Sequence, residues 1–219
     1  MKKVVITGAN GMIGSLILEL CLQDKQIESV LTLARKPLEI KHPKLRQQLH
    51  QDFLNFESIA SIVSDYELCF FCLGVYTGAV SKEMFNTITI DYTKAFCKVF
   101  THNNKHAEIC FLSGQGADSS EKSNILFAKA KGIAENHLLK LPFKNVYIFR
   151  PGYIYPNEPR KEPNFAYRIF RFLYPLMKTI YPSGVIESRQ LAEVMFKIGM
   201  QGGNKIIYEN IDIRKIAKK

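Results

Sequence analysis

Short apolar runs alternate along the chain with longer segments in which apolar residues recur at helical spacing. The runs predict β-strands at Val4–Thr7, Val30–Ala34, Leu68–Leu73, Ile109–Ser113, Val146–Arg150 and Lys205–Tyr208. The longer segments predict helices at Met12–Gln23, Phe56–Ser64, Lys82–His102, Asn124–Leu139 and Leu191–Met200. Alternating strands and helices are typical of an α/β fold with a doubly wound, mostly parallel sheet. In such a sheet the ligand crevice lies at the carboxyl ends of the strands.

The chain has 219 residues, which is enough for one α/β domain with a full core, and we expect residues 1–219 to form a single domain. The composition changes after Arg150, where four prolines interrupt regular structure between residues 151 and 163. An apolar and aromatic segment with interspersed arginines follows them. We therefore expect residues 151–190 to form a small C-terminal cap on the substrate side of the domain.

A glycine-rich turn follows the first predicted strand and leads directly into a helix. Its first glycine permits a tight bend, its second lets the backbone approach a pyrophosphate, and its third allows close helix–strand packing. The helix N-terminus then offers unpaired N–H groups to the phosphates. This context predicts an NAD(P)-binding Rossmann fold. The predicted cofactor-binding residues of the turn are Gly8, Ala9, Asn10, Gly11, Met12, Ile13 and Gly14.

The end of the second predicted strand indicates which dinucleotide is bound. An NAD site usually carries a carboxylate there for the ribose 2′-hydroxyl, but this chain has Arg35 and Lys36. Two cations suit a 2′-phosphate, so we predict NADP, with NAD as the alternative. Strand-end cations are also common as solvated surface residues.

Two further segments fall where the adenine end of a dinucleotide is expected. Leu73 and Gly74 lie at the end of the predicted strand Leu68–Leu73, and Asp52 follows an apolar segment that precedes this strand. Asp52 is equally well explained as a capping residue for the helix that begins at Phe56.

The glycine turn, T-G-x-x-G-x-x-G, resembles that of the short-chain dehydrogenase/reductase superfamily, and in particular its atypical or extended, NAD-dependent epimerase/dehydratase-like members. Later segments resemble the group of Tat-interacting oxidoreductase-like proteins. The segments that carry this resemblance are Asp52-Phe53, Cys72-Leu73-Gly74, Leu112-Ser113, Gly116-Ala117-Asp118 with the stretch to Lys131-Gly132, Arg150-Pro151-Gly152, Tyr174-Pro175-Leu176 and Asn210-Ile211-Asp212-Ile213-Arg214. The resemblance implies cofactor contacts at Phe53, Pro151 and Gly152 as well.

The resemblance also implies a Ser-Tyr-Lys catalytic set, in which the tyrosine transfers the proton. Ser113 occupies the serine position and Lys131 the lysine position, where it would also hold the nicotinamide ribose. Phe127 stands four residues before Lys131, at the tyrosine position, and has no hydroxyl to transfer a proton. Substitute proton donors are Tyr76, Tyr153, water or Lys131, and the sequence does not choose among them.

The net charge of +10 is spread along the chain and forms no block typical of a specific nucleic-acid partner. No apolar run has the length of an integral membrane segment, and no leader precedes the first strand, so a cytoplasmic location is predicted. Residues 165–181 are the best candidate for a partner surface or a homodimer contact, although a helix packed over the crevice explains them better. His102 and His106 have no evident third ligand, and no metal site is expected.

Two classes of function follow from these features. The first is an NADP-dependent oxidoreductase or epimerase-like enzyme with a modified site, acting on a small, unidentified substrate such as a carbonyl compound. The second is a sensor or interaction protein that binds NADP(H) without turnover. A peripheral membrane or nucleic-acid binder is a weaker third alternative.

Overall fold

The computed structural model describes residues 1–102, 104–158 and 165–218, without the side chains of residues 165–172. Seven parallel strands form one sheet in the order β3-β2-β1-β4-β5-β6-β9. These strands are β1 (Lys2–Thr7), β2 (Ile27–Ala34), β3 (Leu45–Leu49), β4 (Leu68–Phe71), β5 (Glu108–Leu112), β6 (Asn145–Arg150) and β9 (Ile207–Glu209). The predicted doubly wound parallel sheet is therefore confirmed.

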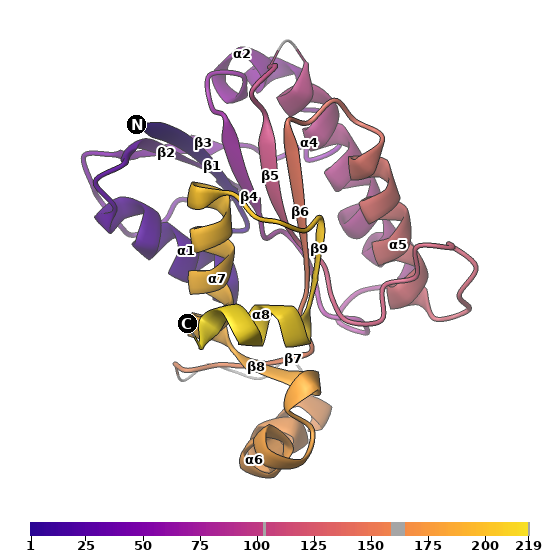
Figure 1. The fold of residues 1–219 in the computed structure, drawn as a ribbon. Helices are drawn as coiled ribbons and strands as arrows, with labels where there is room; N and C mark the ends of the chain where they lie inside the picture. Colours follow the sequence, from indigo (N-terminus) through magenta and orange to yellow (C-terminus); the bar gives the residue numbers. More distant parts are fainter. Residues whose placement is uncertain (103, 159–164, 219) are drawn as a thin grey trace.

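Helices cover both faces of the sheet (Figure 1). One face carries α1 (Met12–Gln23), α7 (Ser188–Gln201) and α8 (Asn210–Ala217), and the other carries α2 (Ala60–Val63), α4 (Tyr92–Thr101) and α5 (Leu126–Leu139). Alternate strand residues serve the two cores: Val4 and Ile6 pack against α1 and α7, whereas Val5 packs on the opposite side. Because both faces are buried, the central strands β1, β4 and β5 are largely apolar.

The strand order reverses at β1, which pairs with β2 on one side and with β4 on the other. The connections from β1 and β4 therefore leave the sheet in opposite directions and open a crevice at their carboxyl ends. In Figure 1 these ends point down, toward helix α6 (Phe165–Ile180) and a two-stranded pair of β7 (Tyr153–Tyr155) and β8 (Val185–Glu187). The fold thus places the glycine turn and the C-terminal segments at the same edge.

Several predicted elements differ from those in the structure. The predicted helix Lys82–His102 is interrupted, because a π-helical turn at Thr87–Asp91 separates α3 (Lys82–Asn86) from α4. The predicted helix Phe56–Ser64 is reduced to a 3-10 turn at Glu57–Ile59 followed by the single turn of α2. Strand β3 was not among the predicted strands, because it pairs on one edge only and reads Leu-Arg-Gln-Gln-Leu.

The described side chains of helix α6, in its C-terminal half, contact the rest of the chain through a small cluster. The Tyr174 ring stacks on Tyr155 at 3.9 Å, and Glu187 accepts hydrogen bonds from Tyr174 Oη at 3.1 Å and Lys178 Nζ at 2.7 Å. Leu176 and Ile180 of the same helix are exposed. Among the helices in the described parts of the chain, none combines the length and apolar character that crossing a membrane requires. The prolines predicted to break structure at positions 159 and 163 lie outside the described residues.

Gly132, in the middle of α5, allows the loop after β5 to lie against that helix. A Cβ at this position would lie 1.8 Å from the carbonyl oxygen of Asp118. Alanine normally stabilises a helix interior relative to glycine by about 1 kcal/mol. Here we expect Gly132→Ala to lower the free energy of unfolding by about 2 kcal/mol, because backbone must move. Urea denaturation measures this free energy of unfolding. Gly74→Ala is the control, since a Cβ at Gly74 meets no atom within 4 Å. Equal stability of the two variants would contradict the close contact.

Candidate functional site

Two cavities meet at the glycine turn, along the carboxyl edge of the sheet. We call the one of about 510 Å³ the inner cavity and the one of about 650 Å³ the outer cavity. The turn lies between them, because residues 11–13 line the inner cavity, residues 8–10 line the outer cavity, and Leu73 lines both. The two cavities therefore form one elongated groove of the kind that an extended ligand occupies.

The glycine turn is built from backbone contacts that exclude side chains. Gly8 has a φ of +73°, and a Cβ on it would lie 2.6 Å from the carbonyl oxygen of Cys72. A Cβ on Gly14 would lie 2.2 Å from the Gly8 carbonyl oxygen, so Gly14 serves the packing of α1 and does not line either cavity. Gly11 precedes α1 as its N-cap without a capping side chain, which leaves N–H groups of the first turn for a ligand.

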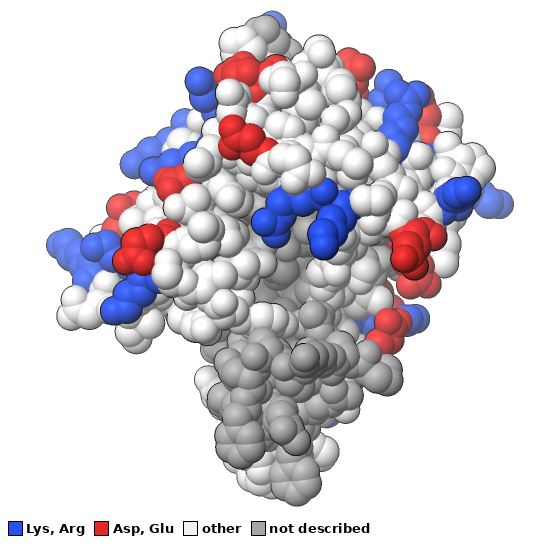
Figure 2. All heavy atoms as spheres, turned by 180° about the vertical axis from the view of Figure 1, so that it is seen from behind, with Lys and Arg blue, Asp and Glu red and all other residues white. Residues whose placement is uncertain are grey.

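The outer cavity ends at two cations. Arg35, Lys36 and Gln51 line it beside Phe53. Asp52 does not line it: its carboxylate accepts a hydrogen bond from the Leu54 backbone N–H at 3.0 Å. Asp52 therefore closes a local turn, and the following 3-10 turn has Phe56 rather than Asp52 as its N-cap. Figure 2 shows Lys and Arg side chains grouped at the rim of a hollow near the middle of one face.

Lys131 reaches the inner cavity from α5. Its Nζ donates a hydrogen bond to the Leu112 carbonyl oxygen at 3.0 Å and lies 5.1 Å from the centre of the Phe111 ring. The side chain is buried, and this burial lowers the Lys131 pKa to about 8, against an opposing effect of the Glu135 carboxylate. Lys131 is therefore a group in this groove that exchanges protons near neutral pH.

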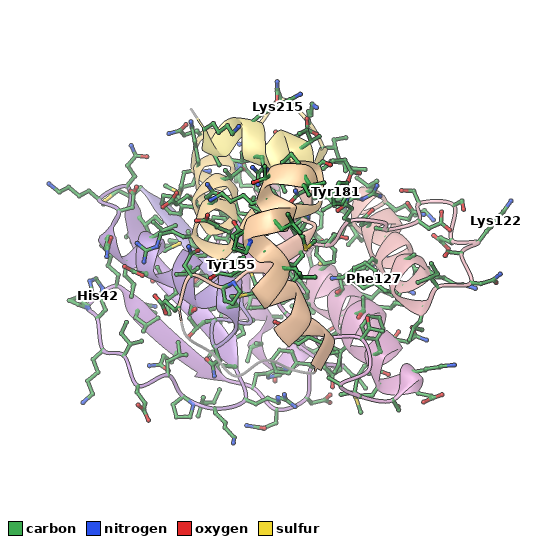
Figure 3. All side chains as sticks on the ribbon, turned by 90° about the horizontal axis from the view of Figure 1, so that it is seen from below. His42, Lys122, Phe127, Tyr155, Tyr181 and Lys215 are labelled. Atoms are coloured by element: carbon green, nitrogen blue, oxygen red, sulfur yellow. The ribbon has the colours of Figure 1, made fainter. Side chains whose placement is uncertain are left out.

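Phe127 lies one helical turn before Lys131 and also lines the inner cavity. A Cβ on Gly114 would lie 2.4 Å from Cζ of the Phe127 ring, so the end of the ring rests against the Gly114 backbone. Figure 3 shows Phe127 and Tyr155 on opposite sides of α6. The structure thus pairs position 127 with position 114, and neither residue carries a hydroxyl.

Ser113 also lines the inner cavity, but its hydroxyl donates a hydrogen bond to Oε1 of Glu135. Glu135 is almost fully buried and pairs with Arg150, whose Nε and Nη2 lie 3.0 and 2.5 Å from the two carboxylate oxygens. The hydrogen bond to Glu135 is also the largest cause of the raised pKa of Arg150. Arg150 further donates to Glu209 at 3.0 Å and to Ser119 at 2.8 Å.

Sequence reasoning missed Glu135 and Gly114. Glu135 stands four residues after Lys131 and eight after Phe127, so all three share one face of α5. That spacing was the available signal for Glu135. Gly114 had no signal, because its role depends on where the Phe127 ring lies.

The remaining predicted residues line the inner cavity at the ends of β4 and β6. Leu73 and Gly74 follow β4, and Pro151 and Gly152 follow β6. The Gly152 N–H donates to Oδ1 of Asn210 at 3.0 Å, which ties this bend to the start of α8. Tyr76 and Tyr153 line the same cavity. Asn210 belongs to a segment that carries the family resemblance, but its contact with Gly152 was not predicted.

Comparison with curated proteins gives distant relatives. No family model matches the chain. It is 26% identical to Protein HTATIP2 of Rattus norvegicus over 166 residues. This aligned region covers 74% of this chain and 66% of the relative. It is 29% identical to Protein FMP52, mitochondrial, of Candida albicans over 153 residues. This aligned region covers 67% of this chain and 65% of the relative. The match therefore spans slightly less than two thirds of the length of these relatives.

Solved structures share the fold. The Bordetella bronchiseptica enzyme WbmH in complex with NAD+ superposes with a TM-score of 0.69 at 15% identity, over 93% of this chain and 73% of that one. Yeast methylglyoxal/isovaleraldehyde reductase Gre2, complexed with NADPH, has a TM-score of 0.69 at 14% identity, over 91% of this chain and 74% of that one. The predicted Rossmann fold and the resemblance to the atypical short-chain dehydrogenase/reductase group are confirmed. The predicted cytoplasmic location is not confirmed, because the fungal relatives are named mitochondrial.

The lowered pKa of Lys131 predicts a pH-dependent stability. Between about pH 8 and the ordinary lysine value of 10.5, the native state has released this proton while the unfolded chain still holds it. Stability therefore gains up to about 3 kcal/mol from this group as the pH rises through that window. Urea unfolding at both ends of the window should show this gain in the wild type relative to Lys131→Met, and Lys129→Met, on the exposed side of α5, should keep it. If the free energies of unfolding of wild type and Lys131→Met change in parallel with pH, Lys131 does not contribute this gain.

Proposed function

We propose that this chain is an NADP(H)-dependent oxidoreductase of the short-chain dehydrogenase/reductase type that acts on a small carbonyl or alcohol substrate. The observation that supports this most is the continuous groove, which has the glycine turn at its centre, cations at one end and Lys131 at the other. Its length and charge match a dinucleotide that carries a phosphate on the adenosine ribose. The resemblance to reductases and to NAD-bound enzymes agrees with this assignment.

The residues present fit the cofactor. The glycine turn offers its backbone to a ligand, since Gly8, with a φ of +73°, lines the outer cavity and Gly11 lines the inner cavity. Gly11 and the first turn of α1 would hold the pyrophosphate, and Arg35 with Lys36 would hold the 2′-phosphate. Lys131 would hold the nicotinamide ribose at the other end of the groove.

The chemistry at the inner cavity differs from that of a Ser-Tyr-Lys site. The bound cofactor supplies or accepts a hydride. Phe127 forms an apolar wall and transfers no proton, while Lys131, with its pKa near 8, holds a proton that it can exchange at neutral pH. Tyr76 and Tyr153 line the same cavity and are further proton donors to be tested. Slow turnover of reactive carbonyls is the expected activity, because a positioned general acid contributes about 10²–10⁴-fold in rate.

A second function is an NADP(H) sensor without turnover. Two observations favour it: the Phe127 ring rests on Gly114, and the Ser113 hydroxyl is engaged by Glu135. Both features remove hydroxyl donors from the places where a carbonyl substrate would need them. In that case occupancy of the groove would change contacts with a partner. A homodimer and a cytoplasmic location remain proposals.

Arg35→Ala tests the choice of cofactor. We expect NADPH affinity to fall by about 10- to 100-fold, because a charge-assisted hydrogen bond to phosphate is lost, while NADH affinity changes by less than about two-fold. Fluorescence titration with each dinucleotide measures both. Arg46→Ala is the matched control, since it removes the same charge from exposed β3 outside the cavity. Equal losses for NADPH and NADH would rule out the 2′-phosphate contact.

Phe127→Tyr distinguishes the enzyme from the sensor. The new hydroxyl is attached to Cζ, the ring atom nearest Gly114, on a residue that lines the inner cavity. We expect NADPH oxidation with methylglyoxal or phenanthrenequinone to rise about 10- to 100-fold, as a general acid is restored. Phe196→Tyr on α7, outside the cavity, is the control. Unchanged activity with intact NADPH binding would favour the sensor.

A further inference from the structure

The Ser113 hydroxyl has one proton, and the structure shows where it points. Ser113 Oγ donates to Oε1 of Glu135, and Glu135 does not line the cavity that Ser113 lines. A hydroxyl that donates its proton in this way retains only lone pairs for any other neighbour. In the direction of the cavity, Ser113 is therefore a hydrogen-bond acceptor.

Glu135 cannot reverse this arrangement. Both of its oxygens accept hydrogen bonds from Arg150, at 3.0 and 2.5 Å, and its side chain is 1% exposed. A carboxylate paired with a guanidinium is ionised and accepts hydrogen bonds only. If Ser113 turned its proton into the cavity, a buried carboxylate oxygen would lose a partner, which is costly.

We propose that Glu135, held by Arg150, is a positioning residue that makes Ser113 a hydrogen-bond acceptor, so that the inner cavity recognises a ligand O–H or N–H group at this point. A ligand carbonyl oxygen finds no donor in Ser113. The inference deepens the proposed function and rests on it, because it assigns the polarity of one contact in the same groove.

Two ligand groups offer the required proton. One is the carboxamide N–H of the nicotinamide itself, and the other is the hydroxyl of an alcohol substrate. Each has a close counterpart without the donor: 3-acetylpyridine adenine dinucleotide phosphate replaces the carboxamide of NADP+ with a methyl ketone, and cyclohexanone replaces cyclohexanol.

The experiment measures the affinities of these two matched pairs by calorimetry, first with the dinucleotides alone and then with the cyclohexyl compounds on NADP+-loaded protein. We expect the donor-bearing member of at least one pair to bind about five- to ten-fold more tightly to the wild type, as one net hydrogen bond implies. The pair that shows the preference identifies the group that Ser113 contacts.

Two variants test the roles of the residues. Ser113→Ala leaves the Glu135–Arg150 pair intact and should abolish the preference. The double variant Glu135→Leu/Arg150→Met removes the pair without leaving a buried charge unpaired, and frees Ser113 to donate into the cavity. In the double variant the preference for the donor-bearing ligand should vanish or reverse. General structural damage would instead weaken the binding of both ligands of a pair.

Equal affinities within both pairs in the wild type would overturn the inference, as would a preference that survives Ser113→Ala or the double variant. If neither dinucleotide binds, the proposed function fails and the inference fails with it. If both dinucleotides bind and no donor preference exists, only the inference fails.

Discussion

Backbone contacts too close for any side chain hold the three loops that border the groove. The Gly8 backbone lies against Cys72, Gly14 lies against the Gly8 carbonyl, and Gly132 lies against the carbonyl of Asp118. Each contact joins the end of one strand to a helix or to the next strand end. The groove is therefore fixed at the level of the main chain, and the side chains that line it act on a frame that cannot widen or shift independently of the sheet.

One face of α5 carries Phe127, which lines the inner cavity, and Glu135, which is buried and does not line it. The Phe127 ring rests on Gly114, and the buried Glu135 pairs with Arg150 of β6. Lys131 lies between them along the helix. A buried ion pair is costly unless its geometry is good and its remaining hydrogen bonds are made, and here Ser113, Ser119 and Glu209 complete them. Lys131, a cation of the inner cavity, thus lies between an apolar ring and a fully hydrogen-bonded ion pair on the same helix face.

Local patterns predicted the elements whose causes are local. The glycine turn, α1 and the buried strands follow from spacing and apolar runs, and the cations at positions 35 and 36 follow from their place after β2. The π-helical turn at Thr87–Asp91 could not be predicted, since the apolar spacing continues across it. Asp52 was ambiguous because its partner, the Leu54 N–H, is a turn contact without a distinctive sequence. The bond from Ser113 to Glu135 joins residues 22 apart, so only the packing of α5 on β5 reveals it.

The Gly152–Asn210 hydrogen bond spans 58 residues and has a consequence for the order of folding. The outer cavity is lined entirely by residues between 8 and 73, so it can form when little more than the first third of the chain has been synthesised. The bend that closes the inner cavity needs Asn210, and non-local contacts of this kind form late. A nascent chain would therefore form the outer cavity well before the inner cavity, and a ligand bound early in the outer cavity would stabilise the half-built domain while the rest is still being made.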